Sequence, residues 1–212
     1  MDTERPAGST RGVDDLSLRI VAAAMALAER DGFDAVRLRD LAVDADVALG
    51  TVYRRFSGKE DILAAALEFE SEKLEQHLRS NPINDSDADD RLRHFFRLAT
   101  AELVSRPKLA SAMLRTIACG EPELAQKVTR YQGRITSMIV DAQRGPSHRA
   151  DEVHPDQVIL AQLLQQIWFG ALVGWTGGLI EPALIDAQME RAVSILTKGL
   201  AADVQGNSKR LP

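Results

Sequence analysis

The residues with the clearest binding chemistry lie between Val47 and Leu63, in the stretch VALGTVYRRFSGKEDIL. It combines small residues, hydroxyl groups and two arginines, and no acidic residue stands between Val47 and Lys59, although carboxylates precede and follow this interval. Hydroxyl and guanidinium groups donate hydrogen bonds to phosphates and base edges, and small residues allow close approach to a groove. The stretch therefore predicts a helix that contacts DNA. The residues expected to contact DNA are Arg37, Arg39, Ala48, Leu49, Gly50, Thr51, Tyr53, Arg54, Arg55 and Lys59.

A helix-turn-helix would position these side chains. Val52 and Phe56 are apolar and four residues apart, so they share one helix face and can anchor it in a core. The preceding segment, Leu38–Ala45, is expected to form the first short helix of the motif. Asp46 then stands where the turn requires a tight, left-handed backbone, which Asp tolerates better than most residues. An earlier helix over residues 15–31 is expected to pack across the motif.

A further helix start follows the motif directly. Ser57-Gly58-Lys59-Glu60 has the Ser-x-x-Glu form of a capping box. Lys59 would then lie near a helix N-terminus, whose free N–H groups can also hold a phosphate.

Residues for other chemistry are missing from the sequence. The four histidines form no two-histidine helical pair, and Cys119 has no second cysteine for a zinc site or an intrachain disulfide. No phosphate-binding glycine loop follows a strand, and no Gly-x-Ser-x-Gly nucleophile elbow occurs. We therefore expect no catalytic residue, no metal and no cofactor, and the chain is not predicted to be an enzyme.

The composition allows DNA binding only if basic charge is local. The chain has 212 residues, a net charge of −5 and 45% hydrophobic residues, which is ordinary for a globular protein with a large core. An acidic balance argues mildly against nucleic-acid binding, so the cluster of basic residues between Arg37 and Lys59 has to supply the contacts. A single cysteine and an N-terminus without an apolar run predict a cytoplasmic location.

The chain as a whole is predicted to be all-α, with about nine helices. Residues 1–14 are expected to be a disordered arm, in which Arg5 and Arg11 either reach a DNA minor groove or belong to a plain solvated tail. Residues 15–57 are expected to form the DNA-binding domain, 58–204 a ligand-binding and dimerisation domain, and 205–212 a polar tail. Helical patterns after the motif cover residues 60–80, 86–104, 108–119, 123–143, 156–178 and 182–203.

One stretch is long enough for a membrane span. No charged residue occurs between Val158 and Ile180. Three glutamines and several glycines interrupt it, and no Lys or Arg cluster flanks it, so a helix buried on most sides is the better interpretation and no membrane partner is expected.

The N-terminal pattern resembles that of the TetR family, a family of bacterial one-component, ligand-responsive transcriptional regulators. The matching residues are Gly32-Phe33, Val36, Arg39, Leu41-Ala42, Ala45-Asp46-Val47, Gly50-Thr51-Val52-Tyr53, Phe56, Lys59 and Leu63. The chain departs from the family at Arg37, Asp46 and Ala48, where Thr or Ser, Gly, and Ser are usual. Arg37 gives up a helix cap and adds a possible phosphate contact. The resemblance implies a homodimer whose last two helices pair with their copies, and a double-stranded DNA operator as partner.

The C-terminal half resembles, more loosely, the repressors of cholesterol catabolism, which bind steroid or other acyl-CoA thioesters. The resemblance lies in the run Ile167–Trp175 and in the segments around Met113 and Arg191. It implies a small apolar effector that releases the protein from DNA. Trp168 and Trp175 share a helix face and either border the effector cavity or serve core and dimer packing. The residues expected to line the cavity are Phe95, Phe96, Met113, Met138, Gln165, Trp168 and Trp175.

A second class of function remains open at this point. The chain could be an all-α carrier or enzyme for apolar ligands in which the helix-turn-helix is only structural. The absence of carboxylates around Thr51–Lys59 favours the DNA-binding regulator, since a structural motif has no reason to exclude them.

Overall fold

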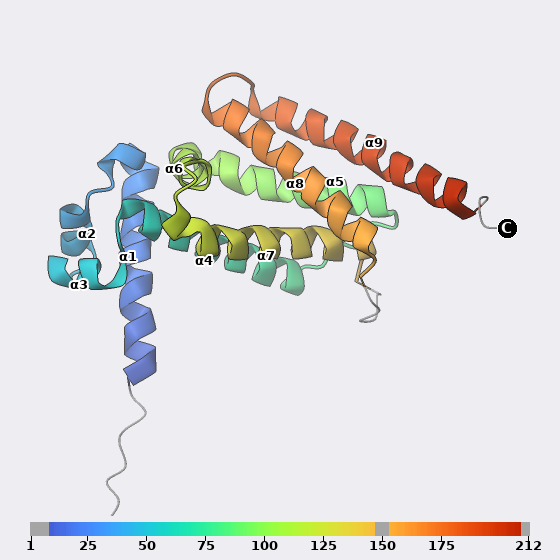
Figure 1. Cartoon of the computed structure of the whole chain (residues 1–212). Coiled ribbons are helices and arrows are strands. Elements are labelled where there is room, and N and C mark those ends of the chain that lie inside the picture. Colours follow the sequence, from blue (N-terminus) through green and yellow to red (C-terminus); the bar gives the residue numbers. More distant parts are fainter. Residues whose placement is uncertain (1–8, 147–152, 209–212) are drawn as a thin grey trace, which may run out of the picture. The chain divides into compact units, whose positions relative to one another are not determined.

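The computed structural model describes residues 9–146 and 153–208, with side chains described for 15–146 and 153–200. These ranges contain helices and no strand, which confirms the all-α prediction (Figure 1). The elements are α1 (Ser9–Asp31), η1 (Phe33–Ala35), α2 (Leu38–Asp44), α3 (Leu49–Arg55), α4 (Lys59–Ser80), α5 (Ala88–Ser105), α6 (Pro107–Ala118), η2 (Pro122–Leu124), α7 (Ala125–Arg144), α8 (Pro155–Thr176) and α9 (Pro182–Ser208).

The chain forms two compact units that are not contiguous in sequence. The first extends to Phe69 and also contains Pro107–Val128, and the second contains Glu70–Arg106 and the residues from Thr129 onward. Helices α4 and α7 therefore each begin in the first unit and continue into the second. The sequence predicted a single division near residue 58, and α6 with the start of α7 was expected in the later part.

The first unit is organised around α1, which packs against α2, η1 and α6. Its apolar stripe is buried, as the 3.6-residue periodicity predicts. Helices α2 and α3 contact each other and add Leu41, Ala42 and Val52 to the same core. The buried residues that α1 contributes are Ile20, Val21, Ala24, Met25, Leu27 and Ala28.

The second unit contains α5, α8 and α9, with α9 packed on both of the others, and the later parts of α4 and α7. The N-termini of α5 and α8 are fixed by side chains: Asp87 accepts a hydrogen bond from the Asp89 N–H, and His154 forms a capping box with Gln157 ahead of Pro155. The core of this unit contains Leu92, Phe95, Phe96, Leu160, Leu164, Trp168, Leu172, Ile185, Met189 and Val193.

The terminal helices are longer than the sequence pattern indicated. Helix α1 begins at Ser9, so residues 9–14 are helical rather than part of a disordered arm. Arg11 therefore stands on this helix, while Arg5 lies outside the described residues. Helix α9 continues to Ser208, into the segment expected to be a tail. Polar residues at helix ends carry no core periodicity, which is why the pattern ended too early at both termini.

In the described part of the chain, α8 is long and apolar enough to cross a membrane by length and composition alone. About a third of its most apolar 18-residue segment, 33%, is buried inside the protein. Leu160, Leu164, Trp168 and Leu172 on one side of it are buried in the second unit. A neighbouring face exposes Ile159, Leu163 and Ile167. Helix α8 thus has an apolar surface that extends beyond its buried side.

Candidate nucleic-acid interface and effector cavity

Helix α3 presents a polar, carboxylate-free face from a buried anchor. Val52 is fully buried, whereas its neighbour Tyr53 is 58% exposed. Gly50 is exposed, and a Cβ atom placed on it would contact nothing within 4 Å, so this side of the helix is open. No acidic residue occurs in the helix or at its two caps, Ala48 and Phe56. The arrangement suits insertion into a groove with phosphates on either side.

The turn before α3 has the strained geometry that the sequence predicted. Asp46 has φ of 49°, and among the described residues it is the non-glycine position with a positive φ. The Arg19 guanidinium of α1 donates to the carbonyl oxygens of Ala45 at 2.5 Å and Asp46 at 3.3 Å. Arg19 thereby satisfies carbonyl groups at the end of α2 and fixes the turn from the neighbouring helix. Sequence reasoning missed Arg19, because no local pattern connects it to residues so distant in the chain.

The arginines on and near α3 differ in their contacts with the rest of the protein. Arg37 and Arg39 are exposed, and Arg37 stands at the N-cap of α2 without a side-chain capping bond, as expected. Arg54 donates to the Thr51 hydroxyl at 2.9 Å, so these two predicted DNA contacts are already joined on the helix surface. Arg55 donates to the Ser17 hydroxyl at 2.8 Å and connects α3 to α1. Arg55 thus has a structural contact in addition to its predicted DNA contact.

Lys59, the first residue of α4, lies over an aromatic ring. Its ammonium group is 4.0 Å from the centroid of Phe33 and 3.9 Å from the Asp34 carboxylate. The Arg115 guanidinium of α6 lies 4.1 Å from the same ring and 3.6 Å from the same carboxylate. Two cations therefore share Phe33 and Asp34, an arrangement stabilised by cation–π attraction and by ion pairing. The predicted contact of Lys59 with a phosphate would have to form beside these contacts.

The start of α4 is capped differently from the expected Ser57–Glu60 box. The Ser57 N–H donates to the Asp61 carboxylate at 3.0 Å, so Asp61, one residue later than Glu60, supplies the acceptor. Asp61 lies in the first turn of the helix, where a carboxylate also interacts favourably with the helix dipole.

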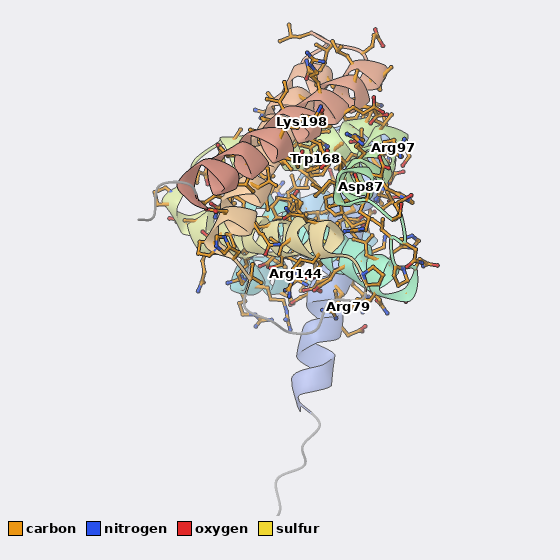
Figure 2. The ribbon with its side chains drawn as sticks, turned by 90° about the vertical axis from the view of Figure 1, so that its right-hand side faces the viewer. Arg79, Asp87, Arg97, Arg144, Trp168 and Lys198 are labelled. Carbon is orange, nitrogen blue, oxygen red and sulfur yellow. The ribbon has the colours of Figure 1, made fainter. Side chains whose placement is uncertain are left out.

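The aromatic residues expected to line a cavity form a packed cluster in the second unit. Phe95, Phe96 and Trp168 are buried, with ring centroids 5.2 Å apart for the phenylalanine pair and 5.7 Å for Phe96 and Trp168. The indole N–H of Trp168, a residue labelled in Figure 2, donates to the buried Thr100 hydroxyl at 2.9 Å. A satisfied indole and edge-to-face rings are typical of core packing.

The other predicted cavity residues are dispersed. Trp175 is half-buried on α8, and Gln165 accepts a hydrogen bond from the Thr136 hydroxyl at 2.7 Å. Met113 is buried in the first unit, whereas Met138 is buried in the second. Among these predicted residues, Met138 lines an open cavity.

That cavity lies in the second unit, where the end of α4, the turn after it and the end of α7 meet. Its volume is about 570 Å³. Its apolar wall consists of Leu78, Pro82, Ile83, Met138 and Ala142. Four charged residues, Glu75, Arg79, Asp141 and Arg144, also line the cavity, together with Gly145 and Pro146, and Figure 2 labels the two arginines. An apolar wall with charged groups beside it suits an amphipathic ligand better than a purely apolar one.

One arginine fixes the frame of this cavity. Arg91 of α5 donates to the carbonyl oxygens of Ala142 at 2.9 Å and Gln143 at 2.7 Å, at the end of α7. It also donates to the carbonyl oxygens of Asp85 and Ser86 in the segment before α5. Arg91 thus satisfies carbonyl groups that the helix end leaves free. No sequence pattern indicated this cavity, because its wall comes from segments far apart in the chain.

Comparison with known proteins assigns the family. A model described as "Bacterial regulatory proteins, tetR family" matches residues 20–66, and one described as "Tetracyclin repressor-like, C-terminal domain" matches residues 86–196. The chain belongs to the TetR family of bacterial regulatory proteins. As a TetR-family member it is a DNA-binding transcriptional repressor, and the resemblance found in its helix-turn-helix residues is confirmed.

Individual relatives extend over most of the chain. The HTH-type transcriptional repressor KstR of Rhodococcus jostii (strain RHA1) is 28% identical over 198 residues, which cover 90% of each chain. The crystal structure of a TetR transcriptional regulator from Rhodococcus sp. RHA1 superposes with a TM-score of 0.76 at 21% identity, covering 86% of this chain and 96% of that one. Thermus thermophilus FadR in complex with lauroyl-CoA gives a TM-score of 0.65 at 20% identity, covering 86% and 94%. These two structures establish the shared fold.

Proposed function

We propose that this TetR-family protein is a homodimeric cytoplasmic repressor that binds a double-stranded operator through α3 and is released by an amphipathic small molecule. The observation that carries the DNA-binding part is the open, carboxylate-free face of α3 around fully buried Val52. We expect Tyr53, Thr51 and Gly50 on this face to contact the groove. Basic charge beside this face comes from Arg37, Arg39, Arg54, Arg55 and Lys59. At the start of the helix, the small residue Ala48 and the apolar residue Leu49 would also contact the DNA.

The apolar surface of α8 and α9 supports a dimer. Ile159, Leu163, Ile167 and Val173 on α8 and Leu184 and Ile195 on α9 are between 40% and 57% exposed. Apolar patches of this kind mark interaction surfaces, and a self-complementary patch produces a twofold dimer. Gly170 is exposed on the same helix with no atom near its missing Cβ, which would allow close approach of the partner helix.

For the effector we propose an acyl-CoA thioester, steroid-derived or fatty. The cavity at the ends of α4 and α7 offers an apolar wall for a hydrocarbon group and Arg79 and Arg144 for anionic groups. The lauroyl-CoA bound in the structurally similar FadR supports this class of ligand. Met138 would contact the apolar part, because it belongs both to the predicted ligand residues and to this cavity.

The remaining predicted ligand residues do not line this cavity. Phe95, Phe96, Trp168, Trp175 and Gln165 of the second unit could accommodate a hydrocarbon chain only if the buried packing around Trp168 opens, whereas Met113 is buried in the first unit. The Trp168–Thr100 hydrogen bond opposes such opening, since it would leave the indole N–H without its partner.

Release would follow from differential binding. A ligand shifts an equilibrium only by its preference for one conformation over another. If the effector prefers a conformation in which the two recognition helices of a dimer no longer match adjacent major grooves, it weakens operator binding.

A mobility-shift titration tests this function. The protein should shift a duplex that spans the region upstream of its own gene at lower concentration than a scrambled duplex of equal length. Lauroyl-CoA or a steroid-derived CoA thioester should reverse the shift, whereas coenzyme A alone should not. Equal binding of the upstream and scrambled duplexes would overturn the operator assignment. A specific complex that neither thioester dissociates would overturn the effector class alone.

A further inference from the structure

We propose that Lys127, in the first turn of α7, is a positioning residue for the recognition helix α3, on which it acts through Asp61 and Phe56. Its ammonium group donates to the Asp61 carboxylate at 2.5 Å and to the Asp61 carbonyl oxygen at 3.4 Å. The same ammonium group lies 5.2 Å from the centroid of the Phe56 ring. Lys127, Asp61 and Phe56 all belong to the first unit.

Asp61 connects this contact to the end of the recognition helix. One of its carboxylate oxygens accepts from Lys127, and the other accepts from the Ser57 N–H at 3.0 Å. Ser57 directly follows Phe56, which is the C-cap of α3 and donates its own N–H to Val52 at 3.0 Å. A chain of two hydrogen bonds therefore runs from α7 to Ser57, the residue that follows the C-cap of α3. Any displacement of Lys127 changes the support of this turn.

The location of Lys127 is not explained by the stability of its own helix. A cation in the first turn of a helix stands at the end where the helix dipole favours anions. Asp61, in contrast, is placed favourably in the first turn of α4. The Lys127 side chain is 24% exposed and that of Asp61 is 15% exposed, so the pair is screened less than a surface ion pair. The contact of Lys127 with Asp61 of α4 explains why a lysine stands at this position of α7.

The effect of Lys127 on operator binding rests on the proposed function. The position of Lys127 on α7 also suggests how a bound effector would affect α3. Helix α7 carries Lys127 in its first turn and contributes Met138, Asp141, Ala142 and Arg144 to the cavity near its other end. The helix that would contact the effector is therefore the helix that supports the end of α3. Sequence reasoning assigned no role to Lys127, because its partners are distant in the chain.

Hydrogen exchange of the free protein tests the contact without DNA. Lys127→Met keeps the aliphatic stem and removes the ammonium group. We expect exchange of the Phe56 and Ser57 amides to become about fivefold faster or more, with no change in α1. Lys73→Met is the matched control, since it removes one lysine charge from an exposed i,i+3 pair with Glu70 on α4. Unchanged exchange at Phe56 and Ser57 would overturn the proposal whether or not the protein binds the upstream duplex.

Duplex binding distinguishes positioning from simple electrostatics. Asp61→Asn removes a negative charge near the DNA-binding face, so electrostatics alone predicts tighter binding. The positioning role predicts weaker binding by about fivefold for both Asp61→Asn and Lys127→Met, with the double variant no weaker than the weaker single one. Lys127→Arg should bind as the wild type does. Tighter binding by Asp61→Asn, or additive losses in the double variant, would overturn the proposal. A wild-type protein that fails to bind the duplex would instead refute the proposed function.

Discussion

Replacing Thr100 by valine isolates the hydrogen bond that fixes Trp168. The Trp168 indole N–H donates to the Thr100 hydroxyl at 2.9 Å, and both residues are 3% exposed. Valine has the shape of threonine but cannot accept a hydrogen bond, so the indole N–H would be buried without a partner. Leaving a buried donor unsatisfied costs about 1–3 kcal/mol. We expect the free energy of unfolding of Thr100→Val to fall by about 2 kcal/mol.

Thr116→Val is the matched control for this prediction. Thr116 is 1% exposed and its hydroxyl donates to the Ala112 carbonyl of its own helix at 3.0 Å. That carbonyl also accepts the regular helical bond, so valine here leaves no buried group unpaired, and the loss should stay below about 1 kcal/mol. Urea unfolding followed by circular dichroism, at one protein concentration because dimerisation would contribute, measures both. Equal losses for the two variants, or a gain for Thr100→Val, would refute the structural assignment of Trp168.

Three further changes test charge and assembly. Lys59→Ala should weaken specific and non-specific DNA binding alike and reduce the salt slope by about one unit, and weakening of the specific complex alone would show that Lys59 contributes to sequence recognition. Ile167→Asp places a charge on the apolar surface of α8 and should convert the dimer into a folded monomer by light scattering; an intact dimer would place the interface elsewhere. Desolvation raises the pKa of Asp186 above its ordinary value of 3.8, with Arg97 opposing and Glu190 adding to the shift. The folded state therefore binds this proton more tightly, so wild-type stability should decrease as the pH rises through the raised pKa; Asp186→Asn should lose this dependence and be more stable at pH 7, and an unchanged pH profile would contradict the assignment.

The fold was predictable because helix periodicity is a local property. The spacing of apolar residues indicated the helices, and Pro107, Pro155 and Pro182 stand at helix starts, where the missing N–H costs nothing. The left-handed turn at Asp46 followed from residue chemistry, and the missing cap at Arg37 followed from its departure from the family pattern. The outer ends of α1 and α9 were misjudged, because their polar residues carry no core pattern.

In the candidate sites, too, local features were predictable from the sequence and contacts between distant residues were not. The exposure of Tyr53 beside buried Val52 follows from one helix face and was predictable. The contacts of Arg19 with the turn, of Lys127 with Asp61 and of Arg91 with the end of α7 join residues that are distant in sequence. No single-sequence pattern reports such contacts. The cavity at Met138 was missed for the same reason. The prediction instead selected aromatic residues, several of which form the packed cluster around Trp168.

The central claim, that the open face of α3 contacts the operator, is tested most directly by the affinity of Tyr53→Phe for the upstream duplex. The variant removes one exposed hydroxyl and should leave the free energy of unfolding unchanged. Fluorescence anisotropy should show binding about fivefold weaker, as expected for one lost hydrogen bond. The control is Tyr131→Phe, at the other tyrosine of the sequence, which lies on α7 in the second unit and does not belong to the predicted DNA-contacting residues. Its affinity should equal that of the wild type. A Tyr53→Phe variant that binds the duplex as tightly as the wild type would contradict the assignment of this face to DNA.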